Sequence, residues 1–115
     1  MIFGFAFNNM KTKKSLHKEW RKNFREGVFA RDKQKCKVCG QTAQDAHHIT
    51  DRHDIPNGGY VLSNGISLCG SCHIKAETGE FPAEDLYKRI ESSYEKAVKE
   101  SNLLECIITG NETSC

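Results

Sequence analysis

No stretch of this sequence is apolar for long enough to cross a membrane, since a spanning helix needs about 20 consecutive apolar residues. A recognisable secretory signal is also lacking: residues 1–7 are apolar, but the run is too short and no basic region precedes it. Both absences predict a cytosolic protein whose thiols stay reduced. Disulfides are therefore not expected, because they persist mainly in oxidising compartments.

Aromatic residues make up only 9% of the 115 residues and apolar residues 37%, which leaves little material for a hydrophobic core. The length predicts a single domain, and there are no internal repeats. Small domains with thin cores usually depend on a metal, a disulfide or a partner for stability. The six cysteines are the obvious source of that stability.

The charged residues are unevenly distributed. Residues 1–38 contain eleven Lys or Arg residues against three acidic ones, a net charge of +8, and the rest contains six against twelve, a net charge of −6. A basic first third favours an anionic partner, with nucleic acid as the leading candidate. A solvated, lysine-rich helix face would produce the same pattern, and charge alone does not separate the two.

Periodicity predicts helices on both sides of an irregular middle. One helix is expected over residues 15–31 and another over 82–101, and their apolar stripes are expected to cover the same small core. These stripes recur at spacing four and consist of Leu16, Trp20 and Phe24 in the first helix and Leu86, Ile90, Tyr94 and Val98 in the second.

The glycine-rich middle predicts short strands near 45–49 and 65–68, then a short helix that begins near Ser71 or Cys72. The predicted organisation is a basic helical segment (1–35), a core (36–80), a C-terminal helix (81–102) and a tail (103–115).

Four cysteines form two C-x-x-C pairs, Cys36 with Cys39 and Cys69 with Cys72. Such pairs place thiolates on tight turns, and a closed tetrahedron of four thiolates is typical of structural zinc. Four thiolates leave no open position, so this zinc should organise the chain rather than catalyse. The remaining cysteines, Cys106 and Cys115, are expected to be spare thiols in the tail.

Histidines concentrate in the loop between the cysteine pairs and just after it. His47 and His48 are adjacent, and His73 follows the last cysteine of the quartet. Neighbours in a strand point to opposite faces, so His47 and His48 cannot bind one metal in the same way. One can coordinate an ion while the other faces a substrate.

In this order the motifs resemble the HNH nuclease family, especially its free-standing phage and mobile-element members. The matching positions are Arg31-Asp32, Cys36-x-x-Cys39-Gly40, His47-His48-Ile49, Pro56-Asn57-Gly58-Gly59, Asn64-Gly65-Ile66, Leu68-Cys69 and Cys72-His73 through Glu77. The resemblance implies an α+β fold, with a zinc-stabilised β-hairpin and helix (ββα-metal, treble-clef-like) between the two flanking helical segments. It also implies a metal-dependent endonuclease that acts on duplex DNA.

The resemblance assigns a role to each matching polar residue. His48 stands at the position of the general base, and His47 and His73 stand where the family holds its catalytic divalent ion. Asn64 stands at the middle position, which constrains the loop and orients the base. Many members have Asp in place of His47, and imidazole favours softer ions than Mg²⁺, so Mg²⁺, Mn²⁺, Ni²⁺ and Zn²⁺ are all candidates. The residues expected to contact nucleic acid are Arg31, Arg52, His53 and Lys75.

Other readings of the same residues stay open. A non-catalytic, zinc-dependent DNA-binding or scaffold module would use the cysteines and the basic first third, but not the histidines and Asn64 together. An RNA nuclease would use similar phosphoryl chemistry. Taken singly, Asn64 fits a plain turn, and His73 fits a hydrogen bond to a zinc-bound thiolate. A homodimer or a protein partner is a possible source of cleavage specificity.

Overall fold

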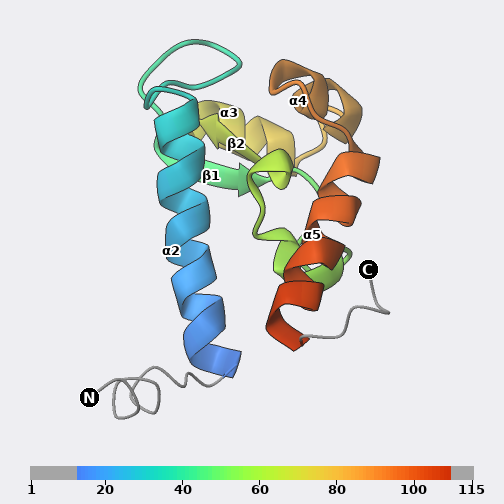
Figure 1. The fold of residues 1–115 in the computed structure, drawn as a ribbon. Coiled ribbons are helices and arrows are strands. Elements are labelled where there is room, and N and C mark those ends of the chain that lie inside the picture. Colours follow the sequence, from blue (N-terminus) through green and yellow to red (C-terminus); the bar gives the residue numbers. More distant parts are fainter. Residues whose placement is uncertain (1–12, 110–115) are drawn as a thin grey trace, which may run out of the picture.

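A two-stranded antiparallel hairpin lies at the centre of the fold (Figure 1). The structure is a computed structural model that describes the backbone of residues 13–109 and the side chains of residues 15–104. The elements follow in the order α2 (Lys13–Arg31), β1 (Asp45–His48), η1 (Pro56–Gly59), η2 (Leu62–Asn64), β2 (Gly65–Leu68), α3 (Gly70–Glu77), α4 (Ala83–Arg89) and α5 (Tyr94–Thr109), where η marks a short 3-10 helix. The expected α+β class and both predicted strands are confirmed.

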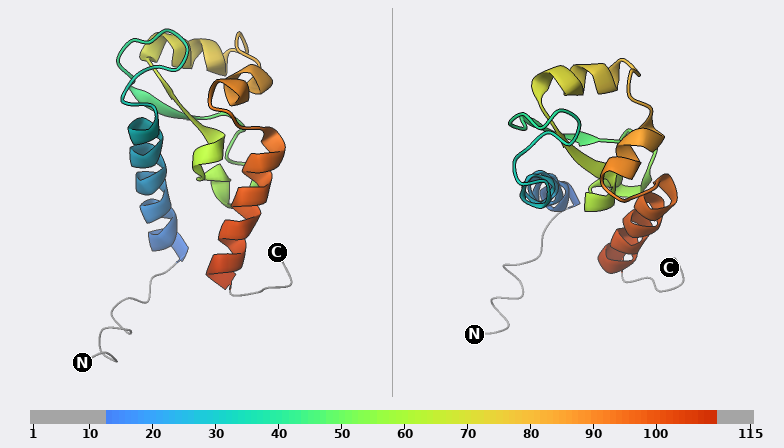
Figure 2. Two further views of the ribbon diagram at one scale, coloured as in Figure 1. Left: turned by 45° about the horizontal axis from the view of Figure 1, so that its top comes forward. Right: turned by 90° about the horizontal axis from the view of Figure 1, so that it is seen from above.

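The two faces of the hairpin pack against different helices. In the register, His47 lies opposite Ile66 and His48 lies opposite Gly65. His48 stacks on Phe24 of α2, whereas the ring of His47 contacts His73 of α3. Seen from above, α3 lies on one side of the hairpin and α2 on the other (Figure 2). The prediction that neighbouring histidines face opposite sides is therefore confirmed.

The two apolar stripes do not share one core. Phe24 and Val28 of α2 are buried against Gly65 of β2. The contact is close: a Cβ added to Gly65 would lie 2.5 Å from Val28 Cγ2 and 2.6 Å from Phe24 Cε1. The main buried cluster instead joins Leu86 and Ala97 to the hairpin and the cysteines, and includes no residue of α2. The expectation of a single shared core is wrong because the hairpin separates the two stripes.

Arg31 and Asp32 anchor the end of α2 to the hairpin. Arg31 Nε and Nη2 donate to the two Asp32 carboxylate oxygens at 2.7 and 2.9 Å, and the same guanidinium donates to the carbonyls of Leu62 and Gly65. The backbone N–H of Ser67 also donates to Asp32. Burial tends to raise the pKa of Asp32, but the hydrogen bonds from Arg31 and Ser67 outweigh it and lower the pKa.

The expected single helix over 82–101 is two helices, α4 and α5. The chain turns between them at Glu91, which has a left-handed φ of 55°. The Ser92 hydroxyl donates to the carbonyl of Ser63, and the Ser93 hydroxyl accepts from the N–H of Lys96. Serine is a strong N-cap because its oxygen satisfies an otherwise unpaired N–H, so Ser93 begins a new helix where the apolar spacing suggested continuity.

The predicted tail also begins too early, because α5 continues to Thr109. The side chain of Cys106 and all of Cys115 lie outside the described residues. Within residues 13–109, no helix combines the length and apolarity that a membrane span requires.

Candidate metal centres

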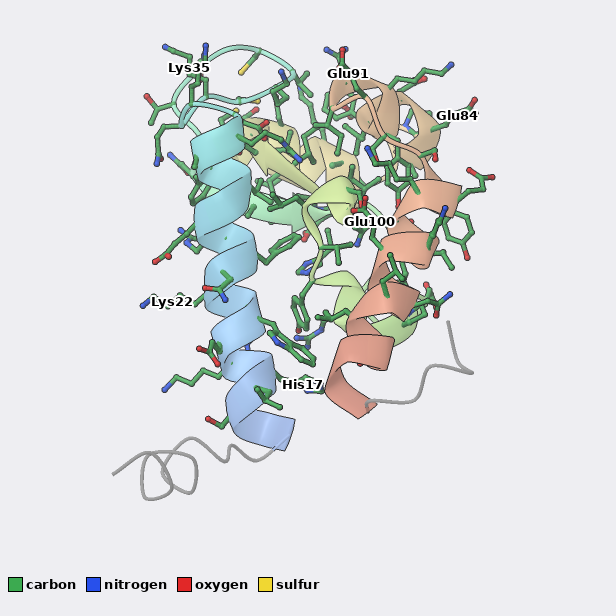
Figure 3. All side chains as sticks on the ribbon, in the orientation of Figure 1. His17, Lys22, Lys35, Glu84, Glu91 and Glu100 are labelled. Carbon is green, nitrogen blue, oxygen red and sulfur yellow. The ribbon has the colours of Figure 1, made fainter. Side chains whose placement is uncertain are left out.

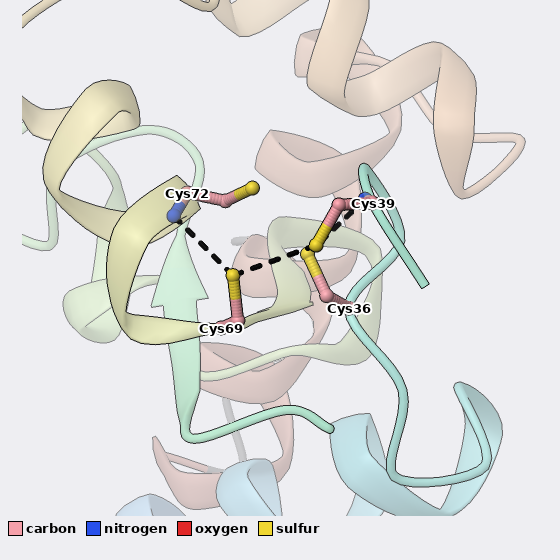
Figure 4. A group of neighbouring side chains, drawn as sticks. All are labelled: Cys36, Cys39, Cys69 and Cys72. Carbon is pink, nitrogen blue, oxygen red and sulfur yellow. Dashed lines mark hydrogen bonds between the residues drawn. The ribbon is translucent and has the colours of Figure 1, made fainter. Parts of the chain in front are cut away.

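Four cysteines from two parts of the chain gather at one point beside α3 (Figure 4). Their sulfur atoms all lie within 4.8 Å of one another. Cys36 and Cys39 occupy the turn that follows α2, which is closed by a bridge between Lys35 and Thr42. Cys69 and Cys72 lie at the start of α3. The quartet is thus positioned to hold a metal ion, as the spacing predicted.

Backbone N–H groups favour ionised thiols in this cluster. The N–H of Cys39 lies 3.5 Å from Cys36 Sγ, and that of Cys72 lies 3.4 Å from Cys69 Sγ. Burial opposes ionisation of Cys36, but the hydrogen bonds prevail and lower its pKa to about 6. The N–H of Cys72 likewise lowers the pKa of Cys69. Burial and the neighbouring thiols raise the pKa of Cys72 to about 12, which a bound cation would counter.

A second cluster of ligand atoms lies between β1 and α3. His47, His73 and Glu77 each place one donor atom within 4.8 Å of the others. His73 is held on both sides, since Nδ1 lies 3.1 Å from Asp45 Oδ2 and Nε2 lies 3.1 Å from Glu77 Oε1. Two imidazoles and a carboxylate suit several divalent transition metals.

Glu77 and Asp45 were not predicted as members of this site. Glu77 follows His73 by four residues on α3, and residues at that spacing share one helix face. That spacing was a readable signal for Glu77. Asp45 and His47 are two residues apart on β1 and so lie on the same strand face, but only the packing of α3 brings His73 to Asp45.

His48 lines the same shallow depression from the other face of the strand. The depression has a volume of about 330 Å³ and is lined by Ala46, His47, His48, Asp51, Arg52, His73 and Glu77. Burial, then His47 and Arg52, lower the pKa of His48 to about 4, so its imidazole is neutral at neutral pH. A larger hollow of about 600 Å³ near α4 contains no histidine or cysteine.

Asn64 is fully buried beneath the loop that joins the two strands. Its Oδ1 accepts from the N–H of Thr50 at 2.9 Å and from the hydroxyl of Tyr87 at 2.7 Å. Its Nδ2 donates to the carbonyls of Thr50 and Gly59. Gly59 has a φ of +63°, and a Cβ there would lie 2.5 Å from Asn64 Nδ2. Asn64 therefore holds the loop after His48, and its link to His48 runs through the backbone of Thr50.

The expected nucleic-acid contacts have different surroundings. Arg31 makes four hydrogen bonds within the protein. His53 is exposed and bonded to Asp51, while Arg52 lines the depression and Lys75 is exposed on α3. Of these residues, the structure brings only Arg52 to the histidines. Their contact with nucleic acid stays a prediction.

Residues 36–79 match the family model described as HNH endonuclease. This segment contains both cysteine pairs, the histidine cluster and Asn64. Neither a curated protein nor a solved structure matches the chain.

Proposed function

We propose that this protein, whose residues 36–79 match the HNH endonuclease family model, hydrolyses phosphodiester bonds of duplex DNA with a divalent metal ion. The observation that carries the proposal is the convergence of three ligand residues (His47, His73 and Glu77) with a neutral histidine, His48, around one depression. A purely structural zinc module needs the cysteines but has no use for this second cluster.

The two clusters suit different metal roles. The cysteine quartet fits Zn²⁺ in a closed, structural site, because four thiolates complete a tetrahedron. The second set offers His47, His73 and Glu77, which leaves coordination positions for water and phosphate oxygens. A divalent ion bound there supplies positive charge for the developing phosphorane and the departing oxygen. Asp45 orients His73 from behind through Nδ1.

His48 is proposed to accept the proton of the attacking water. With its pKa lowered to about 4, the imidazole is unprotonated throughout the neutral range, so its lone pair is available. Nε2 is buried without a hydrogen-bond partner among the described residues. Nδ1 is not buried in this way and is therefore the nitrogen proposed to face the water.

DNA is proposed to lie across the depression, with Arg52 nearest the scissile phosphate. Lys22 and Lys35 project on the α2 side of the molecule, and Glu84 and Glu91 lie on the α4 side (Figure 3). In sequence, α2 has seven basic residues against two acidic ones, whereas α4 balances Glu84 and Asp85 with Lys88 and Arg89. The excess of positive charge on α2 favours approach of a polyanion from that side. Binding is therefore expected to weaken steeply as salt rises.

The test is cleavage of supercoiled plasmid by wild type and His48→Ala, with Mg²⁺, Mn²⁺, Ni²⁺ or Zn²⁺ and a chelator control. His17→Ala is the matched control, because His17 contacts Trp20 on α2 and does not line the depression. We expect metal-dependent nicking or linearisation by wild type and His17→Ala, and a loss of about 100-fold or more in His48→Ala.

Glu77→Gln tests the third ligand, with Glu80→Gln as its control on the next exposed acidic position. Glu77→Gln should demand a higher metal concentration for half-maximal cleavage, while Glu80→Gln should not. If wild type binds DNA but cuts no form of it with any ion, the non-catalytic binding module replaces the nuclease. Cleavage of RNA but not DNA would change the substrate while preserving the chemistry.

A further inference from the structure

The imidazole of His48 lies against two aromatic rings. Its centroid is 4.3 Å from that of Phe24, with an angle of only 4° between the planes, so the rings are stacked. Tyr60 meets His48 edge-on, at 5.2 Å and 76°, and also meets Phe24 at 6.1 Å. Each ring thus contacts the other two. Offset stacking and edge-to-face contacts are the favoured geometries of aromatic pairs.

These rings reach His48 from outside the strand that carries it. Phe24 belongs to α2 and precedes the family-matched segment 36–79. It can approach because Gly65, which pairs with His48 across the hairpin, has no side chain in the space that the Phe24 ring occupies. Tyr60 lies in the connection between β1 and β2, directly after Gly59, whose carbonyl accepts a hydrogen bond from Asn64. Three separate parts of the fold therefore meet at one imidazole.

No hydrogen bond from the described residues fixes the side chain of His48. Functional histidines are commonly oriented by a hydrogen bond to the ring nitrogen that does not react, and His73 has carboxylates beside both of its nitrogens. In His48, Nε2 is buried and without a partner. The aromatic contacts are thus the interactions that remain to set the plane of this ring.

We infer that Phe24 and Tyr60 are positioning residues that hold the His48 imidazole edge-on to the depression, in the place of a hydrogen-bonding partner. The inference rests on the proposed function, since it gives these rings a part in the hydrolysis. Stacking on Phe24 restrains tilting of the imidazole plane, and the edge contact with Tyr60 restrains sliding of the imidazole along the Phe24 ring. Nδ1 is then presented to the depression without a polar contact that would compete for its lone pair.

Ordinary core packing would also bury Phe24, and the two roles predict different results. A packing residue affects stability, whereas a positioning residue also changes turnover in molecules that remain folded. Misplacement of a catalytic group by about 1 Å can cost about 100-fold in rate. The variants must therefore keep apolar volume while removing the ring.

The experiment compares Phe24→Leu and Tyr60→Leu with wild type in the full-length, metal-loaded protein. Phe29→Leu is the matched control, because Phe29 lies on the same helix and stacks with Arg25 rather than with His48. Tyr60→Phe keeps the edge contact and should restore normal cleavage. We expect kcat to fall about 10- to 100-fold in both ring-removing variants, with KM and the metal concentration for half-maximal activity unchanged.

A second readout does not depend on activity. The carbon-bound protons of the His48 ring should resonate upfield in wild type because of the stacked Phe24 ring, and should move downfield in Phe24→Leu but not in Phe29→Leu. If Phe24→Leu fails to fold, the Tyr60 pair decides. Folded Leu variants that cleave at the wild-type rate, or unchanged His48 resonances, would overturn the inference. If wild type itself does not cleave, the proposed function is wrong, and the rings have no catalytic role. Normal cleavage by the Leu variants rejects only the positioning role and leaves the proposed function intact.

Discussion

Asp45 Oδ2 lies 3.1 Å from His73 Nδ1, although the two residues are 28 positions apart. The contact occupies Nδ1, and Nε2 lies 3.1 Å from Glu77 Oε1, so an ion held by His47, His73 and Glu77 would bind Nε2. Carboxylate–histidine pairs of this kind fix the ring and raise the basicity of the ligand.

Asp45→Asn should therefore weaken the affinity of the histidine cluster for Mn²⁺ or Ni²⁺ by about 10- to 100-fold. Isothermal titration of the zinc-loaded protein measures this affinity directly. Asp54→Asn, in the exposed loop, is the control and should bind as wild type does. An unchanged affinity in Asp45→Asn would show that the pair has no influence on the metal.

Cys69→Ala should lose the folded domain, not only slow the reaction, because structural zinc contributes directly to folding free energy. Circular dichroism during heating and the zinc content of the purified protein measure the two consequences. Cys106→Ala is the control, since the sequence predicts a spare thiol there. Native melting behaviour of Cys69→Ala would contradict a structural role for the quartet.

Asp32→Asn should destabilise the fold by about 2 kcal/mol, as expected for hydrogen bonds to a charged group. The lowered pKa of Asp32 means that its stabilisation is complete above the unfolded pKa near 4 and is lost only below it. The difference in melting temperature from wild type should thus stay constant between pH 6 and 8. A difference that changes across this interval would assign the stabilisation to another group.

Tyr87→Phe removes the hydroxyl that donates to Asn64 Oδ1 at 2.7 Å and lies 2.6 Å from Thr50 Oγ1. We expect a loss of about 1–2 kcal/mol in urea unfolding. Tyr94→Phe, at an exposed position, should be neutral. Equal stability of both variants would mean that Asn64 holds the loop without Tyr87.

Local chemistry made the central part of the fold predictable from sequence. The C-x-x-C spacing predicted the cysteine quartet that is positioned to hold a metal ion, and strand alternation placed His47 and His48 on opposite faces. The break between α4 and α5 was missed because the apolar spacing of four runs across it, although Ser93 carries a helix-cap signal. The hydrogen bond from the N–H of Lys96 to Ser93 marks the start of α5, although the apolar stripe continues across the break between the helices.

Contacts made by tertiary packing were beyond such reasoning. Glu77 could have been found from its spacing to His73, but the pairing of Asp45 with His73 depends on how α3 lies over β1. Phe24 was correctly predicted to face a core, but nothing local indicates that the surface opposite it is His48. Predicting which side chains of two different elements touch requires the angle between those elements, and sequence periodicity does not specify that angle.

The anchoring of α2 limits how far the family-matched segment can act as a portable module. Residues 36–79 contain the ligands of both clusters, yet the Arg31–Asp32 anchor and the ring stacked on His48 lie before them. A graft of 36–79 into another scaffold would transfer the candidate metal ligands and the lining of the depression, but not the Phe24 ring that stacks on His48. A transplant that retains the site should begin no later than the turn of α2 that carries Phe24, so the smallest exchangeable unit is larger than the motif that identifies it.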